Sequence, residues 1–400
     1  MGRIVHLGLG NFARAHLLDY TADAGGWDVL GVSLRSPRIR DGLAAQGFAY
    51  DLCVQGEGVK RIRVLTGVLV APEDPGAVLE ALRQADIISA TVTEKGYHLN
   101  PQGMLDLEDP AIRSDLTGQG PATLIGFLAH ALAERRRPVT VLSCDNRAGN
   151  GDALNAAVLR FAEVAGLGID RAKLRFPNAM VDRITPASTD ALRQISGDPM
   201  AVPTEAFREW VVEDDFAGPR PDWPGVTYVQ DVAPHELRKL RMLNGAHSFL
   251  AYAGLARGHC HVHEAVSDPV LRAAASRLMA EAAATLPDTV RGMADDYAKA
   301  LMARFDNPEL QHRLIQIAMD GSEKVPYRLV ATLRDARGAA PTVASGLRAW
   351  IDFCVSQTRA GVALDDPRAA ALAEASRATD PARAILSLIG AEDVLPVIAA

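Results

Sequence analysis

Short apolar runs alternate with amphipathic segments along the first half of the chain. Five of these runs are bounded by glycine or polar residues, which is typical of buried strands. They cover residues 3–7, 27–34, 63–69, 85–93 and 138–144. Helical patterns lie between several of them, at residues 11–19, 75–84 and 122–136. Alternating strands and helices predict a mostly parallel sheet with right-handed crossovers.

Three further apolar segments follow, on either side of a connection rich in proline and glycine at residues 217–225. They cover residues 173–184, 209–213 and 226–232. Their short length and β-branched content favour strands. We expect these strands to extend the same sheet.

The pattern changes at His235 to long segments rich in alanine, leucine and arginine with a helical period. These segments cover residues 235–257, 268–285, 293–304 and 344–357. A second, mainly α-helical domain is therefore predicted, with the boundary near Asp231. The predicted fold class is α/β over residues 1–230 and mainly helical over residues 231–400.

Composition supports two domains and excludes some partners. A chain of 400 residues with 48% hydrophobic content can bury two cores. The net charge of −7 argues against a nucleic-acid or anionic-membrane partner, and no apolar run is long enough to span a membrane. The N-terminus lacks a signal-peptide pattern, and the four cysteines are widely spaced. We therefore expect free thiols and a cytoplasmic location.

A glycine turn follows the first predicted strand and precedes a helix. Gly8-Leu9-Gly10 resembles the start of a dinucleotide fingerprint, in which glycine lets backbone amides approach a pyrophosphate. The third glycine of that fingerprint is replaced by the small residue Ala13. The pattern favours a Rossmann-type dinucleotide-binding domain, although an ordinary glycine turn is the alternative.

The acidic residue that usually binds the adenosine ribose is missing. The second predicted strand ends in Ser33-Leu34-Arg35-Ser36, and Arg38 follows. The two arginines either receive a 2′-phosphate or are merely solvated. The expected cofactor is therefore NAD, with NADP not excluded.

A lysine, an asparagine and a histidine are grouped at the start of the helical domain. On an α-helix, Asn244 and His247 lie about 140° and about 80° around the axis from Lys239, so all three share one broad face. A desolvated lysine can act as general base toward a hydroxyl, and an amide can donate to the developing alkoxide. The alternative is a solvated lysine, a helix break at Asn244-Gly245 and a core histidine.

Four segments together resemble the mannitol dehydrogenase family of polyol-specific long-chain dehydrogenases, and the resemblance covers nearly the whole chain. They are residues 8–16 (GLGNFARAH), 91–97 (TVTEKGY), 143–146 (SCDN) and 239–248 (KLRMLNGAHS). Ala13 stands where the family commonly has histidine. The run Lys-x₄-Asn-x₂-His and the SCDN strand end are more specific than the glycine turn.

The resemblance implies a metal-independent hydride transfer with Lys239 as general acid/base. It also implies that Asn146 and Asn244 stabilise the oxyanion and that His247 positions the substrate. Glu236 matches a carboxylate that passes the proton to solvent, with a helix-surface ion pair as the alternative. The cofactor contacts expected from the motifs are Gly8, Gly10, Asn11, Phe12, Arg35, Thr93 and Glu94.

Residues expected near the substrate include Asp182, Gln316 and Lys324. Asp182 and Glu94 match family positions near the pocket, but each could instead pair with the basic residue that follows it. Mannitol 2-dehydrogenases tend to have arginine where Gln316 stands, so the resemblance leans toward fructuronate reductases. Lys324 is available for a polar or carboxylate end of the substrate. The expected reaction interconverts D-fructuronate and D-mannonate, with mannitol or another polyol as the alternative substrate.

Two other functions compete with this prediction. The segment 259–263 (HCHVH) contains possible metal ligands, which would suit a zinc-dependent alcohol dehydrogenase, but no further pair with ligand spacing is evident. A nucleotide-binding protein that has lost catalysis is the alternative of another class. Partners beyond a small sugar acid or polyol are not expected, and the chain is expected to be a monomer or a simple homo-oligomer.

Overall fold

The computed structural model describes residues 2–118 and 120–399. The chain divides into two compact units, one ending at Ala233 and the other beginning at Pro234. The first unit contains a parallel sheet and the second is helical. Both parts of the predicted fold class are therefore confirmed.

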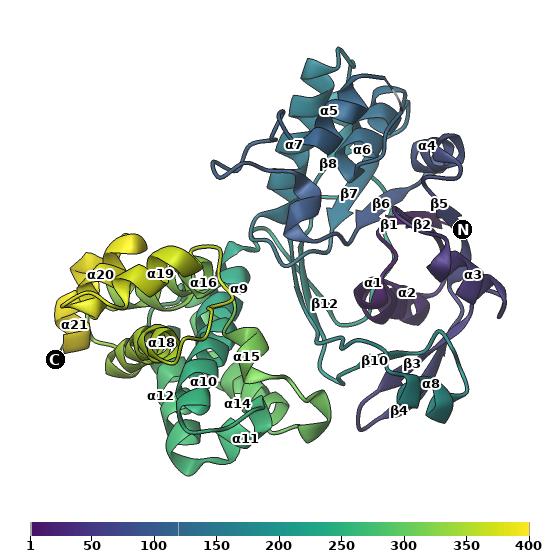
Figure 1. Cartoon of the computed structure of the whole chain (residues 1–400). Coiled ribbons are helices and arrows are strands. Elements are labelled where there is room, and N and C mark those ends of the chain that lie inside the picture. The colour runs from purple at the N-terminus through teal and green to yellow at the C-terminus, as the bar shows by residue number, and fades with distance from the viewer. Residues whose placement is uncertain (1, 119, 400) are drawn as a thin grey trace. The chain divides into compact units, whose positions relative to one another are not determined.

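The main sheet of the first unit has six strands in the order β5-β2-β1-β6-β7-β8, and every neighbouring pair is parallel (Figure 1). This order places β1 and β6 side by side at the centre, where the direction of winding reverses. Open sheets of this kind bind ligands at that switch point, outside the carboxyl ends of the strands. The strands are β1 (Gly2–Leu7), β2 (Trp27–Ser33), β5 (Leu65–Val70), β6 (Ile87–Ala90), β7 (Val139–Ser143) and β8 (Leu174–Arg175).

Helices cover both faces of this sheet, because successive strand residues point to opposite sides. Ile4 faces the core beneath α1 and α2, whereas the next residue, Val5, faces the core beneath α4, α6 and α7. Both strand residues are fully buried. The helices of this unit are α1 (Asn11–Ala15), α2 (Leu17–Ala24), α3 (Arg38–Ala44), α4 (Pro75–Gln84), α5 (Pro110–Leu116), α6 (Leu124–Ala133), α7 (Asn150–Val164) and α8 (Asp190–Ser196).

The predicted extension of the sheet is wrong for most of its strands. Only β8 joins the main sheet, whereas a separate mixed sheet forms in the order β12-β11-β9. A further sheet, β10-β3-β4, was not predicted. Its hairpin has few buried side chains and therefore a weak apolar pattern. These strands are β3 (Tyr50–Val54), β4 (Gly58–Ile62), β9 (Ala179–Asp182), β10 (Val202–Thr204), β11 (Glu209–Glu213) and β12 (Val226–Val229).

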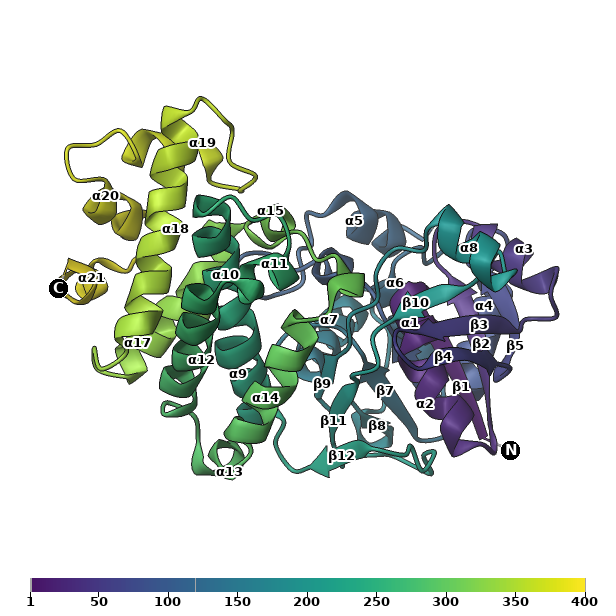
Figure 2. The same cartoon turned by 90° about the horizontal axis from the view of Figure 1, so that it is seen from below.

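The second unit is built around α10, which packs against both α12 and α18 (Figure 2). In the part of the chain that the structure describes, no helix is both long and apolar enough to cross a membrane. The larger helices are α9 (Ala233–Arg238), α10 (Gly245–Ala256), α11 (Val262–Ser267), α12 (Pro269–Ala283), α14 (Ala294–Phe305), α18 (Pro341–Arg359), α19 (Ala369–Ala375) and α20 (Pro381–Leu388). The shorter ones are α13 (Asp288–Arg291), α15 (Leu314–Ile317), α16 (Gly321–Val325), α17 (Ala331–Asp335) and α21 (Leu395–Ala399).

The segment predicted as one α-helix over residues 235–257 contains a π-helical part. The π-helix η3 covers Lys239–Asn244 and lies between α9 and α10. The Gly245 amide bonds to the Leu240 carbonyl, which is the five-residue step of a π-turn. The angles calculated for an ideal α-helix are therefore wrong here. A five-residue step places Asn244 about one helical turn after Lys239, closer to the same side of the helix than the predicted angle of about 140° implied.

Candidate active site

The turn between β1 and α1 depends on one glycine. Gly8 has a φ of +88°, and an added Cβ would lie 2.2 Å from the Thr91 carbonyl oxygen. Its amide donates to the Val32 carbonyl at 3.0 Å, which ties the turn to β2. Gly10 is different, because an added Cβ there would meet nothing closer than the Gly8 carbonyl oxygen at 3.8 Å. The space beside Gly10 is open to a ligand.

A pocket of about 530 Å³ opens beside this turn. Its walls come from the carboxyl ends of β1, β2 and β6, including Gly8–Gly10, Ser33–Ser36 and Thr91–Thr93. Among the lining residues that the structure describes, none is acidic. Arg35 is exposed at the edge of the pocket, so the charge nearest the end of β2 is positive.

The seven predicted cofactor residues fall into two groups. Gly8, Gly10, Arg35 and Thr93 line the pocket. Asn11, Phe12 and Glu94 are not among its lining residues. The Asn11 amide donates to the Ser188 hydroxyl and its oxygen accepts from Arg14, while the Phe12 ring stacks on His16 at 5.0 Å. Glu94 is exposed at the start of the short helix η1 (Glu94–Tyr97).

A buried carboxyl group joins the ends of β6 and β7. Asp145 accepts hydrogen bonds from the Val92 amide at 2.8 Å and from the Tyr97 and Ser143 hydroxyls at 3.0 Å each. Burial raises the pKa of Asp145 to about 7, although these hydrogen bonds oppose the shift. Asn146 follows directly and is exposed. The Asp145 contacts therefore connect the turn that lines the pocket to the strand end that carries Asn146.

Asp182 lies at the end of β9, where it is buried and opposite Glu209 of β11. The neighbouring Arg183 donates to Asp19 at 2.6 Å, and both of these side chains are almost fully buried. Arg183 is therefore engaged with the first turns of the unit, and its ion pair is a structural one.

In the second unit, Lys239 and Asn244 occupy the two ends of η3, and His247 follows in the first turn of α10. Lys239 and Asn244 are half-buried, and so is Glu236 in the preceding helix α9. The four expected catalytic side chains of this unit thus belong to one continuous helical segment. π-turns within α-helices occur frequently at functional sites, because they break the regular register.

His247 lies in a closely packed, positively charged environment. Its ring is 4.8 Å from the Phe305 ring and 5.2 Å from the His312 ring, measured between centroids. Burial is the main reason why the pKa of His247 lies well below its usual value, and His312, Arg304 and Arg328 lower it further. His247 is therefore neutral at pH 7 and can both donate and accept a hydrogen bond.

The two predicted substrate residues of this unit lie in one segment. Gln316 is exposed on α15. Lys324 is on α16, where its ammonium group donates to the Met319 carbonyl at 2.8 Å and pairs with Asp320 at 3.2 Å. Lys324 is thus held by its own turn.

Two residues without a predicted role contribute to these surroundings. Asp145 was visible in the SCDN segment, but its bonds to Val92 and Tyr97 depend on the pairing of β6 with β7. His312 lies 65 positions after His247, and no periodic pattern in the sequence connects the two. Only the tertiary structure could reveal these contacts.

The segment 259–263 takes part in a helix cap. Glu264 accepts hydrogen bonds from the amides of Cys260 and His261 and from the His261 ring, which begins α11. Across residues 2–118 and 120–399, no group of three or more histidine, cysteine or acidic side chains is arranged to hold a metal ion.

Comparison with known proteins identifies the family. The family model of the mannitol dehydrogenase Rossmann domain matches residues 2–225, and that of the mannitol dehydrogenase C-terminal domain matches residues 231–394. The chain belongs to the mannitol dehydrogenase family. The resemblance inferred from the four sequence segments is therefore confirmed, and the chain is an oxidoreductase of this family.

Relatives within the mannitol dehydrogenase family differ in substrate. A D-mannonate oxidoreductase of Escherichia coli (strain K12) is 37% identical, covering 97% of this chain and 88% of that protein. A mannitol 2-dehydrogenase of Cereibacter sphaeroides is 35% identical, covering 94% and 86%. The structure of Pseudomonas fluorescens mannitol 2-dehydrogenase with NAD and D-mannitol is similar, with a TM-score of 0.79 at 30% identity over 100% of this chain and 93% of that one.

Proposed function

We propose that this enzyme uses NAD to interconvert D-fructuronate and D-mannonate, with Lys239 as the general acid/base and no metal ion. The observation that carries the reaction type is the set of Lys239, Asn244 and His247 on one helical segment interrupted by a π-turn. The substrate is inferred from Gln316, which replaces the arginine expected for mannitol 2-dehydrogenases, and from the 37% identity to a D-mannonate oxidoreductase.

The pocket beside the glycine turn fits the expected dinucleotide. Its volume of about 530 Å³ lies in the usual range for cofactor sites, and the open space beside Gly10 permits close approach of a pyrophosphate. Gly8, Gly10, Arg35 and Thr93 would hold the cofactor in this pocket, and Asn11, Phe12 and Glu94 would support the turns around it. When bound, the nicotinamide supplies the hydride acceptor or donor.

Side chains of the protein accept and donate the proton of the substrate hydroxyl and stabilise its oxygen. In the direction of oxidation, Lys239 takes the proton of the substrate hydroxyl as the hydride leaves the same carbon, and in reduction it returns that proton to the carbonyl oxygen. The amides of Asn146 and Asn244 donate to the oxygen as negative charge develops on it. Neutral His247 hydrogen-bonds to the substrate without adding charge. Glu236 passes the proton between Lys239 and solvent.

Positive charge near His247 favours an acidic substrate. Arg304 and Arg328 lie close enough to His247 to lower its pKa, and Lys324 lies on α16 of the same unit. Such groups suit the carboxylate of a sugar acid better than an uncharged polyol. Asp182 and Gln316 would contact its hydroxyl groups. We also propose a cytoplasmic location, for which the support is the wide spacing of the four cysteines in the sequence.

The test is a comparison of NADH oxidation at 340 nm with D-fructuronate, D-tagaturonate and D-fructose. Turnover of fructuronate with a clearly higher kcat/KM supports the proposal. Turnover of fructose alone would instead assign a mannitol 2-dehydrogenase activity. No turnover with any of the three would contradict the sugar-acid assignment and favour other polyols or a nucleotide-binding protein.

Removal of Lys239 tests the catalytic role directly. Lys239→Ala should lower kcat by about 10² to 10⁴-fold, the usual contribution of a general acid/base, with little change in NADH affinity. Lys299→Ala is the matched control, because that lysine is 78% exposed and pairs only with Asp296 among its described neighbours. Wild-type turnover by Lys239→Ala would refute the assignment.

A further inference from the structure

The turn that carries Lys324 is fixed to its surroundings at several points. The Tyr252 hydroxyl donates to the Ala318 carbonyl at 3.3 Å, and the Asp320 amide donates to the Asp365 carbonyl at 2.9 Å. Asp320 has a φ of +56°, a conformation that costs a non-glycine residue free energy. The turn is therefore fixed from outside in a conformation that is uncommon for a non-glycine residue.

The beginning of α16 lacks its usual cap. Asp320 is in the N-cap position, where an aspartate normally accepts from the amides of the first turn. Here its side chain makes no cap bond, and its carboxylate pairs with Lys324 at 3.2 Å instead. An amide of the first turn must then find another acceptor.

Asp366 supplies that acceptor from the loop between α18 and α19. Its carboxylate accepts from the Ser322 amide at 2.8 Å and from the Ser322 hydroxyl at 2.6 Å. The same carboxylate accepts from the Arg368 amide at 2.8 Å, which fixes its own loop. A residue 44 positions away in sequence thus caps the helix and leaves Asp320 available to Lys324.

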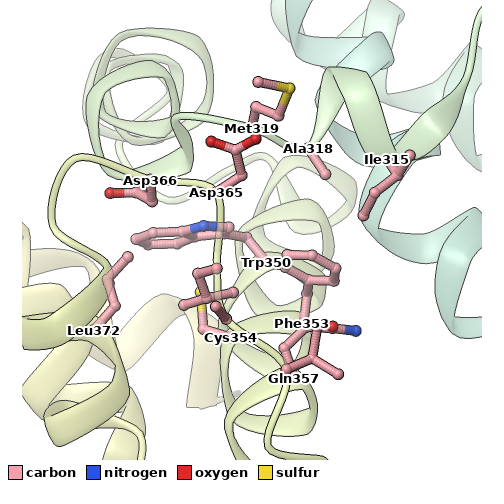
Figure 3. A pocket seen from close by; sticks show the side chains of 13 residues that line it. Ile315, Ala318, Met319, Trp350, Phe353, Cys354, Gln357, Asp365, Asp366 and Leu372 are labelled. Carbon is pink, nitrogen blue, oxygen red and sulfur yellow. The ribbon is translucent and has the colours of Figure 1, made fainter.

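Close packing prevents this turn from rearranging. An added Cβ at Gly321 would lie 2.4 Å from Nε1 of Trp350 and 2.9 Å from the Tyr252 hydroxyl. Trp350 is 1% exposed, and Figure 3 shows its indole with Asp365, Asp366 and Leu372 around it. The cavity beside it has a volume of about 180 Å³, less than the range of about 300 to 1,000 Å³ of most ligand pockets. It is a space beneath the loop rather than a ligand site.

We propose that Asp366 is a positioning residue for the substrate, acting through Lys324. By capping α16 at Ser322, Asp366 holds the turn in which Asp320 and the Met319 carbonyl orient the ammonium group of Lys324. This inference rests on the proposed function, in which Lys324 binds a polar or carboxylate end of the substrate. Loss of Asp366 should weaken substrate binding and leave the cofactor pocket of the other unit unchanged.

The experiment compares Asp366→Ala and Asp366→Asn with Asp365→Ala in the full-length enzyme. Asp365 is a matched control, because it is the adjacent carboxylate beside the same cavity and contributes only its backbone carbonyl to the turn. We expect Asp366→Ala to raise the KM for the sugar acid about tenfold with kcat changed less than about threefold. Asp366→Asn, which keeps one acceptor oxygen, should restore part of this loss. Asp365→Ala should match the wild type.

A double-mutant cycle with Lys324→Ala separates positioning from general damage. If Asp366 acts through Lys324, Asp366→Ala should raise KM by less than about twofold in the Lys324→Ala background. An undiminished effect there, or an increase in the NADH dissociation constant, would overturn the inference. If Asp366→Ala does not fold, the same comparison is made with Asp366→Asn.

The KM values distinguish a failure of the substrate role of Lys324 from a failure of the positioning role of Asp366. Wild-type KM in Lys324→Ala would contradict the substrate role of Lys324 in the proposed function. A raised KM in Lys324→Ala together with a wild-type KM in Asp366→Ala would contradict only the positioning role of Asp366.

Discussion

Gly8 and Gly10 stand two residues apart in one turn, yet the backbone requires glycine only at the first of them. Gly8 needs a positive φ and has no room for a Cβ beside the Thr91 carbonyl, whereas Gly10 meets neither constraint. The first glycine is therefore needed by the fold. The second is needed only if a ligand approaches the backbone closely.

A pair of alanine variants tests this difference. Gly8→Ala should lower the free energy of unfolding by about 2 kcal/mol or more, because it combines backbone strain with a steric clash. Gly10→Ala should leave stability within about 1 kcal/mol and weaken NADH binding at least about tenfold. Urea unfolding and fluorescence titration with NADH measure the two effects. Equal loss of stability in both variants would contradict this division.

Asp145 should make stability depend on pH. Burial raises its pKa from 3.8 to about 7, so between these values the folded protein keeps a proton that the unfolded chain releases. The free energy of unfolding therefore falls as pH rises from about 4 to about 7, by at most about 4 kcal/mol from this group. Above pH 7 the contribution is constant.

Asp145→Asn should remove this pH dependence. The side-chain amide still accepts from the Val92 amide and cannot ionise. The free energy of unfolding of the variant, measured relative to that of the wild type, should therefore be higher at pH 8 than at pH 5. Thermal unfolding at both pH values measures the difference. Asp365→Asn, an exposed carboxylate, is the control and should show none. The same difference in both variants would argue against Asp145 as the cause.

At the scale of elements, periodicity predicted strands and helices well where the apolar pattern was long or complete. The helix at residues 75–84 and the strand at residues 209–213 were predicted with the observed bounds, because a proline begins the helix and a short run of buried positions defines the strand. The hairpin of β3 and β4 was missed, since its apolar face consists only of Tyr50, Leu52 and Ile62, which is too short a pattern to stand out in the sequence.

The π-turn of η3 could not be predicted from the sequence, because residues 239–244 read as an ordinary amphipathic helix. Contacts with distant residues hold it instead. Arg241 is buried and donates to the Thr285 carbonyl at 3.0 Å and hydroxyl at 2.7 Å, and it also pairs with Asp335. The sequence therefore predicts which chemical groups form the candidate site but not the geometry that presents them.

Arg241→Met tests this anchoring. The variant keeps the length of the side chain and loses its hydrogen bonds, so the free energy of unfolding should fall by about 1 to 3 kcal/mol. We also expect kcat to fall, because Lys239 and Asn244 lie at the ends of the anchored segment. Arg334→Met is the control, since its ion pair with Asp393 is about half exposed, at 46% and 55%, and should contribute less than about 1 kcal/mol. Unchanged stability in Arg241→Met would show that η3 is held by other contacts.

At the scale of the whole molecule, net charge and local charge have opposite signs. The chain carries a net charge of −7, yet the pocket beside the glycine turn has no acidic lining residue among those described and has Arg35 at its edge. A net negative charge would oppose the approach of an anionic cofactor, whereas the local positive charge favours it. The absence of an acidic residue after β2 also means that a 2′-phosphate meets no fixed negative charge in this pocket.

Arg35→Asp should therefore separate the two nicotinamide cofactors. We expect NADPH affinity to fall at least about tenfold, because attraction to the 2′-phosphate becomes repulsion, while NADH affinity changes less than about threefold. Arg113→Asp reverses the same charge on α5 outside the pocket lining and serves as the control. Titration of each variant with NADH and with NADPH measures the two dissociation constants. An equal loss for NADH and NADPH would show that Arg35 does not lie near the 2′ position.

The bond between Ser322 and Asp366 also has a consequence for synthesis of the protein. The ribosome produces Ser322 44 residues before the carboxylate that caps its helix, so a nascent chain cannot secure this turn until the loop after α18 emerges. A chain that stops after α18 would contain Lys239, Asn244, His247 and Lys324 but not the residue that caps the turn. If Asp366 positions Lys324 as proposed, substrate binding depends on the chain beyond α18 as well, where none of the proposed catalytic residues lies.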